Sequence, residues 1–411
     1  MSQTDVVVVG AGPAGLAAAR DLGRQGLRVT VIDEYPLAGG RLLGQLYRAG
    51  GHWWVGRRVA DQLLSDIAGH ASIEVRLRAS VIGIERRQED WVVYDSAQAE
   101  PVWAGAVLLA TGAAEMPLAM PGWTLPGVMT VGAAQVMANV HRVRPGQRGI
   151  MVGLGPLSFA VAQELHWAGV ELAGVVLPPP PEAGMPGRNP DEEWRGMTHL
   201  AHLAPSWLRP LTPLLRRDGW LRRLMAAAPK GGIAVGGARL RPNVAALALQ
   251  GDEAVSGIVL QRLDAEGHLV AEPWQEHVDF VCLSGGLRPI PDMAVAAGAA
   301  MHYTADGRYD VPLAGSHGET TVPGLYVAGN IMGIEGAPVA MAQGQMAAIG
   351  VLRYLLRQPD GFGAEAAESR RRLAEARRQA PLVFDPAWAT VHEVVMAEWR
   401  ARQKEARAGE V

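Results

Sequence analysis

Short apolar runs alternate along the chain with segments whose apolar residues recur at helical spacing. The first run, Val6–Val9, is followed by a glycine turn, a helical pattern and a second apolar run, Val29–Ile32. Such runs are typical of strands buried on both faces of a parallel sheet, with the helix as the crossover between them. A second copy of this order starts near residue 148. The hydrophobic pattern therefore predicts an α/β chain.

The turn after the first strand has the glycine spacing of a dinucleotide-binding site. Gly10 permits the tight turn, Gly12 lets the backbone approach a pyrophosphate, and Gly15 lets the helix pack close to the strand. Pro13 and Ala14 stand where the helix begins, and the N–H groups of a helix start can donate to phosphate oxygens. We expect these five residues to bind a nucleotide.

Two acidic residues, Asp33 and Glu34, follow the second apolar run. A carboxylate at this point accepts hydrogen bonds from an adenosine ribose. Spacing alone does not settle which of the two points inward, although counting from Gly10 favours Asp33. These residues alone also leave FAD and NAD open.

Three further stretches favour FAD. They are a second glycine turn, "PLAGGR" at 36–41, an apolar strand that enters a Thr-Gly turn, "VLLATGAAEMP" at 107–117, and a strand with a Gly-Asn turn and a long apolar helix from Leu325 onward. With the first turn, they resemble the two-dinucleotide-domain flavoproteins, the class of thioredoxin reductase and glutathione reductase. The implied fold is α/β, with two Rossmann-like dinucleotide-binding domains and a helical C-terminal tail.

This resemblance also implies the residues around the flavin. In that class an Ala-Thr-Gly turn joins the two domains, a Gly-Asp turn binds the ribityl chain, and the helix after it lies beside the pyrimidine end of the flavin. Asn330 replaces the usual Asp, and its amide oxygen can still accept from a ribityl hydroxyl. The residues carried over are Gly40, Arg41, Val81 near the adenine, Ala110, Thr111, Gly112, Gly329, Asn330, Gly336 and Ala337.

Two stretches narrow the resemblance, 121–135 and 281–303. They are similar to the flavoprotein subunits of heteromeric, dye-linked amino-acid dehydrogenases, which include proline and hydroxyproline dehydrogenases, opine oxidases and a hydrogen cyanide synthase subunit. The likeness reaches about Leu356. It implies an FAD-binding oxidoreductase subunit that relays electrons from a partner's oxidation of a secondary amine to an acceptor other than NAD. Substrate chemistry in this family sits on a different subunit, so we expect no catalytic residue here.

The single cysteine limits the redox chemistry of the chain itself. One Cys cannot form an internal disulfide, a CxxC pair or a four-thiolate iron–sulfur cluster. Cys282 lies in an apolar run and is interpreted as a small buried hydrophobe. The family resemblance implies an amine-oxidising flavoprotein subunit as a partner, and because this chain has no cysteine cluster of the kind that many members of the family carry, it also implies a separate small [2Fe-2S] protein. No metal site is expected.

The second glycine turn is incomplete along the sequence. Gly153, Gly155 and Ser158 repeat the turn, but the position that corresponds to Asp33 is Val176, and prolines occupy 178–181. Without an acid there, a ribose 2′-hydroxyl loses its acceptor. We expect a degenerate NAD(P) site, with weak NAD(H) binding as the alternative.

The remaining patterns set the organisation of the chain. The expected domains are 1–115 and 285–360 for FAD, 116–284 for the inserted NAD(P)-type domain, and 361–411 for a helical extension. The last helix either folds back on its own chain or docks a second subunit. Apolar residues at helical spacing over 207–229 predict a surface helix pair.

Charge and hydropathy exclude two classes of partner. The net charge of −3 gives no sign of a nucleic-acid partner, and no apolar run is long enough for a transmembrane helix. With no basic leader before the first strand, we expect a cytoplasmic protein.

Two other functions stay open from the residues. One is a free-standing NAD(P)H-dependent flavin reductase of a quinone or a ferredoxin-like acceptor. The other is a structural subunit with an inert FAD.

Overall fold

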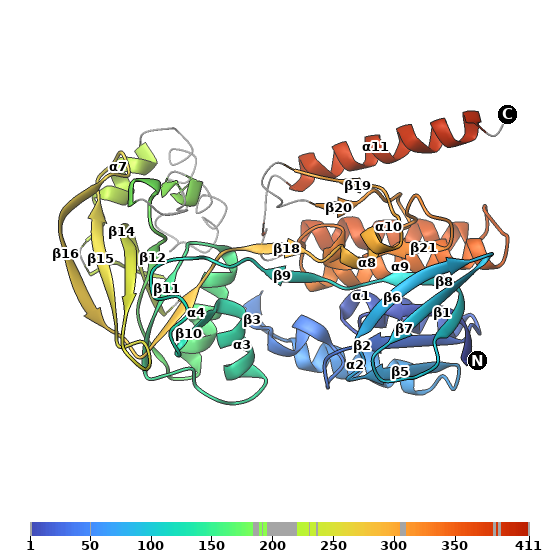
Figure 1. Ribbon diagram of the computed structural model, residues 1–411, viewed down its shortest axis with the longest axis horizontal. Helices are drawn as coiled ribbons and strands as arrows, with labels where there is room; N and C mark the ends of the chain where they lie inside the picture. Colours follow the sequence, from blue (N-terminus) through green and yellow to red (C-terminus); the bar gives the residue numbers. More distant parts are fainter. Residues whose placement is uncertain are drawn as a thin grey trace. The chain divides into compact units, whose positions relative to one another are not determined.

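The computed structural model describes most of the 411 residues and divides into two compact units (Figure 1). The described residues are 2–49, 51–183, 189–190, 192–194, 220–229, 231–235, 237–304, 310–380, 384 and 388–409. The first unit comprises Met1–Gln45, Val55–Ala114 and Leu287–Val411, and the second comprises Leu46–Trp54 and Glu115–Gly286.

A seven-stranded sheet forms the centre of the first unit, in the order β5-β2-β1-β8-β7-β6, with β21 also pairing with β8. Its strands are β1 (Ser2–Val9), β2 (Val29–Asp33), β5 (Ile73–Leu77), β6 (Val81–Arg87), β7 (Asp90–Asp95), β8 (Val102–Leu109) and β21 (Leu325–Val327). β1 pairs in parallel with β2 and β8, and β21 pairs in parallel with β8. Val6, Val7 and Val8 are fully buried, as the continuous apolar run predicts.

Helices from both ends of the chain pack together in the first unit. They are α1 (Pro13–Arg24), α2 (Gly56–Ala68), α8 (Asp292–Ala296), α9 (Ala337–Leu355), α10 (Gly363–Arg378) and α11 (Trp388–Gly409), with 3-10 turns η1 (Gly40–Gly44) and η5 (Gly329–Ile331). α1 and α9 approach closely, because a Cβ at Gly344 would overlap the backbone of Ala14. This approach brings the N-terminal glycine turn next to the C-terminal part of the unit.

The C-terminal helix α11 folds back onto its own unit. Trp388 and Val395 are buried against Val311 and Leu313, close to the short strands β19 (Met301–His302) and β20 (Val311–Pro312) (Figure 1). The first of the two alternatives for this helix is therefore confirmed.

An eight-stranded sheet forms the second unit, in the order β10-β17-β11-β12-β14-β15-β16, with β13 paired to β14. Its strands are β10 (Val128–Thr130), β11 (Arg148–Val152), β12 (Glu171–Leu177), β13 (Ile233–Val235), β14 (Ala238–Gln250), β15 (Gly257–Leu263), β16 (Leu269–His277) and β17 (Phe280–Leu283). The helices α3 (Val131–Asn139) and α4 (Pro156–Trp167) pack against each other. β15 and β16 form the antiparallel hairpin whose turn contains Glu266 and Gly267.

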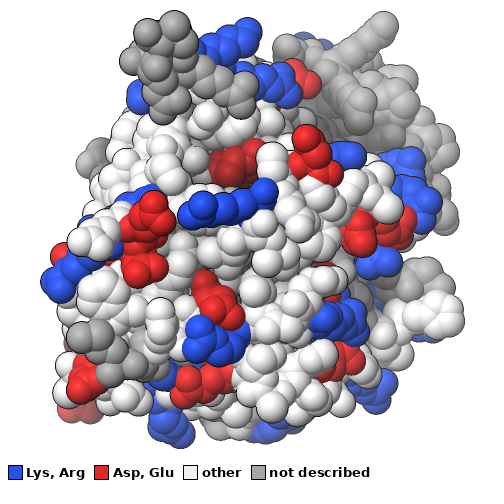
Figure 2. Space-filling model, turned by 90° about the vertical axis from the view of Figure 1, so that its right-hand side faces the viewer, with Lys and Arg blue, Asp and Glu red and all other residues white. Residues whose placement is uncertain are grey.

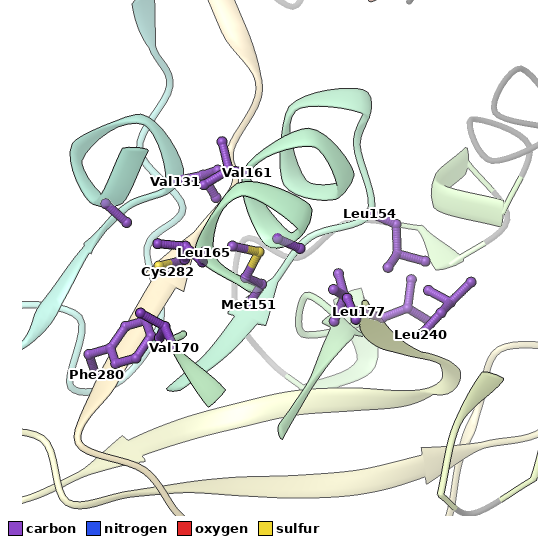
Figure 3. Packing of buried hydrophobic residues seen from close by; sticks show 14 of the residues in the cluster. Val131, Met151, Leu154, Val161, Leu165, Val170, Leu177, Leu240, Phe280 and Cys282 are labelled. Carbon is purple, nitrogen blue, oxygen red and sulfur yellow. The ribbon is translucent and has the colours of Figure 1, made fainter. Parts of the chain in front are cut away.

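The core of the second unit lies between α3, α4 and the sheet (Figure 3). Phe280, Met151 and Leu165 are fully buried there, and Cys282 lies among them. Burial raises the pKa of the Cys282 thiol well above its usual range. The interpretation of this residue as a buried hydrophobe is confirmed.

Short strands occur where the chain passes from one unit to the other. β9 (Ala113–Glu115) pairs with β18 (Leu287–Pro289), and the hairpin β3 (Leu46–Ala49) with β4 (His52–Val55) lies at the other passage. On that hairpin Trp53 makes an edge contact with Trp167 of α4.

Two expectations concern the outside of the chain. On the face that Figure 2 shows, acidic and basic side chains are interspersed, which agrees with the small net charge. Among the described helices, none combines the length and the apolar character that crossing a membrane needs. The helix pair over 207–229 falls largely outside the described residues, which include α7 (Trp220–Ala226).

Candidate functional site

The first glycine turn joins β1 to α1 with very little space around two of its glycines. Gly10 has φ 106°, which favours glycine, and a Cβ there would overlap the Ala110 carbonyl. A Cβ at Gly15 would overlap the Gly10 carbonyl oxygen. The turn, the start of the helix and residue 110 therefore pack as closely as the sequence predicts.

The middle glycine of this turn faces open space. Apart from the residues that adjoin Gly12 in the chain, no atom of the described residues lies within 4 Å of the position that a Cβ on Gly12 would take. Gly40 lies beside it, since a Cβ on Gly40 would be 3.0 Å from the Gly12 Cα, and the Gly39 N–H donates to the Ala11 carbonyl at 2.7 Å. The two glycine-rich turns thus border one cradle, in front of the N–H groups of α1.

Asp33 points to this turn, and Glu34 is exposed. Asp33 Oδ2 accepts a 2.6 Å hydrogen bond from the Ala11 N–H, and Oδ1 accepts from the Tyr35 N–H at 2.8 Å. The Asp33 carbonyl accepts from the Ala79 N–H at 3.1 Å, which brings the segment before Val81 alongside. The geometry favours Asp33 over Glu34 as the carboxylate next to the turn.

The Ala-Thr-Gly turn is held by hydrogen bonds within the first unit. Thr111 Oγ1 donates to the Ile290 carbonyl at 2.7 Å, and the Ile290 N–H donates to the Gly112 carbonyl at 3.1 Å. Arg41 Nη2 donates to the Ala113 carbonyl at 2.7 Å, with Nε of the same side chain at 3.1 Å. A Cβ on Gly112, like one on Gly12, would meet nothing within 4 Å.

The Gly-Asn turn lies against the first glycine turn. A Cβ on Gly329 would be 2.9 Å from the Ala14 Cβ, although the two residues stand at opposite ends of the sequence. Asn330 Oδ1 accepts from the Glu335 N–H at 3.2 Å, and α9 starts after Gly336. The structure thus brings together the two stretches on which the FAD prediction depends.

This arrangement fits FAD. The first N–H groups of α1 and α9 have no partner within their helices, and they suit the negative pyrophosphate and an electron-rich flavin edge. The open side of Gly12 leaves room for the backbone approach that a pyrophosphate requires. Bound FAD supplies two-electron and one-electron chemistry, and the protein supplies position and electrostatics.

The second glycine turn, in the second unit, has a related construction. Gly155 faces nearly open space, as Gly12 does. Ser158 is fully buried, and its Oγ donates to the Gly153 carbonyl at 2.8 Å, so the hydroxyl is satisfied where the first turn has Gly15. Val176 is buried in β12 and offers no acceptor, as expected.

A carboxylate nevertheless reaches this turn, from a residue that sequence reasoning missed. Glu193 Oε2 accepts from the Leu154 N–H at 2.9 Å, and Glu193 is only 7% exposed. Leu154 corresponds to Ala11, so the bond repeats the one from Ala11 to Asp33. The prediction that no acid stands at the end of β12 holds, and the carboxylate at this turn comes instead from Glu193, which the sequence reasoning did not consider. No spacing rule points to Glu193, because it lies beyond the prolines.

A second buried carboxyl in this unit was also not predicted. Glu164, on α4, accepts hydrogen bonds from Gln135 Nε2 at 2.9 Å, Asn139 Nδ2 at 2.7 Å and the Leu46 N–H at 3.2 Å. Burial raises the pKa of Glu164 to about 7. This carboxyl links α3 and α4 to the hairpin that begins at Leu46.

Other candidate chemistry is sparse. Across the described ranges, no three His, Cys, Asp or Glu side chains come together as metal ligands. His52 is exposed on the hairpin of the second unit.

Comparisons with known proteins agree with this geometry. The family model of the pyridine nucleotide-disulphide oxidoreductases matches residues 4–189, and that of glucose inhibited division protein A matches residues 313–359. Similar in fold is an L-proline dehydrogenase from P. horikoshii, with a TM-score of 0.63 and 20% identity over 91% of this chain and 59% of that one.

Two curated relatives are similar over most of their length. One is an opine oxidase subunit of Agrobacterium tumefaciens, which is 32% identical, covering 91% of this chain and 70% of the relative. The other is the hydrogen cyanide synthase subunit HcnB of Pseudomonas protegens, which is 30% identical, covering 92% and 76%. The resemblance that the sequence motifs indicate is confirmed. This chain belongs to the family of these opine oxidase and hydrogen cyanide synthase subunits, and it is an FAD-dependent oxidoreductase with the pyridine nucleotide-disulphide oxidoreductase fold.

Proposed function

We propose that this chain is the FAD-binding subunit of a heteromeric dehydrogenase that oxidises an amino acid or a related secondary amine. The observation that carries the proposal is the similarity to an opine oxidase subunit over 91% of the chain, together with the cradle around Gly12. The names of the relatives describe subunits, which supports an assembly with partner chains.

In this proposal the side chains of the first unit bind and orient FAD. Gly10, Gly12 and Gly15 let the pyrophosphate approach the start of α1, and Asp33 accepts from the ribose. Asn330 and the start of α9 hold the ribityl chain and the pyrimidine end. The amine is oxidised on a partner subunit, so none of these residues acts as an acid or a base on the substrate.

The electrons leave for an acceptor other than NAD. The lone, buried Cys282 excludes a four-thiolate cluster within this chain. A small [2Fe-2S] protein is therefore the proposed next carrier.

Purification of the tagged chain from its source cell tests this proposal. The expected result is a yellow complex that contains an amine-oxidising flavoprotein and a cysteine-rich small protein, and whose FAD is reduced by a secondary amino acid. Recovery of the yellow chain without partners contradicts the heteromeric assembly. A complex whose FAD no donor reduces indicates the structural subunit with an inert cofactor.

A second candidate function is favoured by Glu193. Because its carboxylate lies at the second glycine turn, this turn has the acceptor that a dinucleotide ribose needs. An NAD(P)H-dependent flavin reductase of a quinone or a ferredoxin-like acceptor then becomes the alternative. Stopped-flow mixing of the isolated chain with NADH distinguishes the two, since rapid loss of flavin absorbance favours the reductase.

A further inference from the structure

The segment 329–337, here named the flavin loop, is fixed from outside by the two C-terminal helices. This loop runs from the Gly-Asn turn to the start of α9. The sequence places those helices in a separate extension, and for the last helix it suggests either packing on the chain or docking a partner. Their contacts with the flavin loop were not predicted.

Glu335 connects the loop to α10. Its carboxylate accepts two hydrogen bonds from the Arg377 guanidinium, at 2.7 Å from Nε and 2.8 Å from Nη2, and a third from Gln343 Nε2 at 3.0 Å. The Glu335 side chain is 14% exposed and that of Arg377 is 35% exposed. A two-pronged, partly buried pair of this kind is stronger and more directional than an exposed ion pair.

The backbone of Glu335 connects this pair to the ribityl end of the proposed site. Its N–H donates to Asn330 Oδ1 at 3.2 Å. One residue therefore contacts α10 through its side chain and orients the Asn330 amide through its main chain. A shift of the Glu335 backbone changes the direction of the amide that the ribityl chain would contact.

α11 covers the middle of the flavin loop. Gly333 has φ 149°, and a Cβ there would overlap the indole of Trp388. Trp388 is 5% exposed, and α11 is held further along by a 3.0 Å hydrogen bond between His302 Nδ1 and the Glu398 carboxylate. The loop is thus packed against one C-terminal helix and paired by charge to the other.

We propose that α10 and α11 hold the flavin loop in its FAD-binding conformation, with Glu335 and Arg377 as positioning residues. The inference rests on the proposed FAD site and adds that the affinity for FAD depends on these two helices. When Arg377 is lost, Glu335 keeps only Gln343 among these side-chain donors, and the loop is freer to leave the conformation that binds. FAD must then order the loop when it binds. The affinity for FAD falls, because part of the binding free energy is used to bring the loop into its FAD-binding conformation.

The test compares two neutralised arginines on one helix. Arg377→Gln removes the pair to the flavin loop, and Arg372→Gln removes the Arg372–Glu368 pair, which is more exposed and joins two residues of the same helix. FAD is removed from each full-length protein, and its dissociation constant is measured by quenching of FAD fluorescence, beside the melting temperature of the apoprotein. We expect Arg377→Gln to weaken FAD binding about tenfold, while Arg372→Gln leaves it unchanged and both apoproteins melt close to the wild type.

Further variants separate positioning from general stability. Glu335→Gln is expected to weaken binding as much as Arg377→Gln, and the double variant no more than either, because both act through one contact. Equal FAD affinity of the wild type and Arg377→Gln overturns the inference, as does an equal loss in Arg372→Gln.

Two remaining outcomes are also decisive. If Arg377→Gln does not fold, Arg377→Lys replaces it: Lys keeps the charge without the planar fork, so a loss of about threefold or more supports the inference and an unchanged affinity overturns it. Failure of the wild-type chain to bind FAD at all refutes the proposed function itself, which differs from wild-type binding that the variants do not alter.

Discussion

At the scale of single residues, Gly12 gives the most direct test of the FAD site. Gly12→Val should abolish FAD binding, because the new side chain would occupy the open space that the backbone presents to a pyrophosphate. The apoprotein should still fold, since within the described part of the chain the added Cβ meets no atom within 4 Å other than those of the adjoining residues. The flavin absorbance of the purified protein measures the outcome.

A matched control exists in the same unit. A Cβ on Gly69 also meets nothing within 4 Å, at the end of α2 and away from both glycine turns. Gly69→Val should keep its full FAD content. A yellow, fully loaded Gly12→Val protein refutes the site assignment.

Glu193 can be tested at the second turn. Glu193→Gln keeps the shape of the side chain but removes the charge that accepts from the Leu154 N–H and, in the reductase alternative, from a ribose hydroxyl. We expect NADH affinity, measured by calorimetry, to fall about tenfold. FAD content serves as the internal control and should not change. Identical NADH binding by both proteins excludes a ribose contact for Glu193.

The Glu164 carboxyl should make the stability of the chain dependent on pH. Its pKa is about 7 in the folded state, above its ordinary value of 4.5, so the folded state binds the proton more tightly than the unfolded state. The free energy of unfolding therefore falls as the pH rises from about 4.5 to 7, by at most about 3 kcal/mol. Glu164→Gln has no such group, so its stability relative to the wild type should rise over the same range, from about pH 4.5 to pH 7, in urea unfolding. Parallel pH profiles of the two proteins would contradict this effect.

At the scale of elements, α11 is part of the core of the first unit. Deleting the residues after Phe384 removes Trp388 and Val395 and uncovers Val311 and Leu313. Each buried apolar side chain contributes about 1.5–3 kcal/mol, so we expect a lower melting temperature and aggregation on concentration. Light scattering and thermal unfolding measure both. A truncated chain that melts like the full one and loses only its partners would instead support a docking helix.

The sequence predicted those elements that are determined by the residue pattern within a single short segment. The turn at Gly10, Gly12 and Gly15 follows from spacing, because a side chain at these positions would obstruct the tight turn, the approach of a pyrophosphate and the packing of the helix, respectively. Spacing placed an acid beside the turn but left Asp33 and Glu34 open, and the hydrogen bonds of the folded chain favour Asp33. The α/β fold class with two Rossmann-like sheets is confirmed on this basis.

The elements that sequence reasoning missed depend on contacts between distant segments. Glu193 reaches the second turn from beyond the prolines, and Glu335 meets Arg377 from a different helix. Neither contact leaves a periodic or spaced pattern in the sequence. The apolar face of α11 was visible, but amphipathicity does not reveal whether that face covers its own chain or another one.

At the scale of the whole molecule, the first unit is built from three separate parts of the chain. β21 pairs in parallel with β8, and α9 packs on α1, so residues between 325 and 355 complete a sheet and a helix layer that begin near the N-terminus. The second unit consists of one long stretch, 115–286, and a short hairpin.

This discontinuity sets an order for biosynthesis. A ribosome adds residues from the N-terminus, and domains fold as their parts emerge. When residue 286 has been added, the second unit has all of its chain, whereas the first unit still lacks β21, the flavin loop and α9. The pyrophosphate turn at Gly12 is therefore synthesised long before the Gly-Asn turn that lies against it in the folded unit. A nascent chain stalled before Leu325 would hold only one side of the proposed FAD site, so FAD is expected to bind only after the flavin loop has been synthesised.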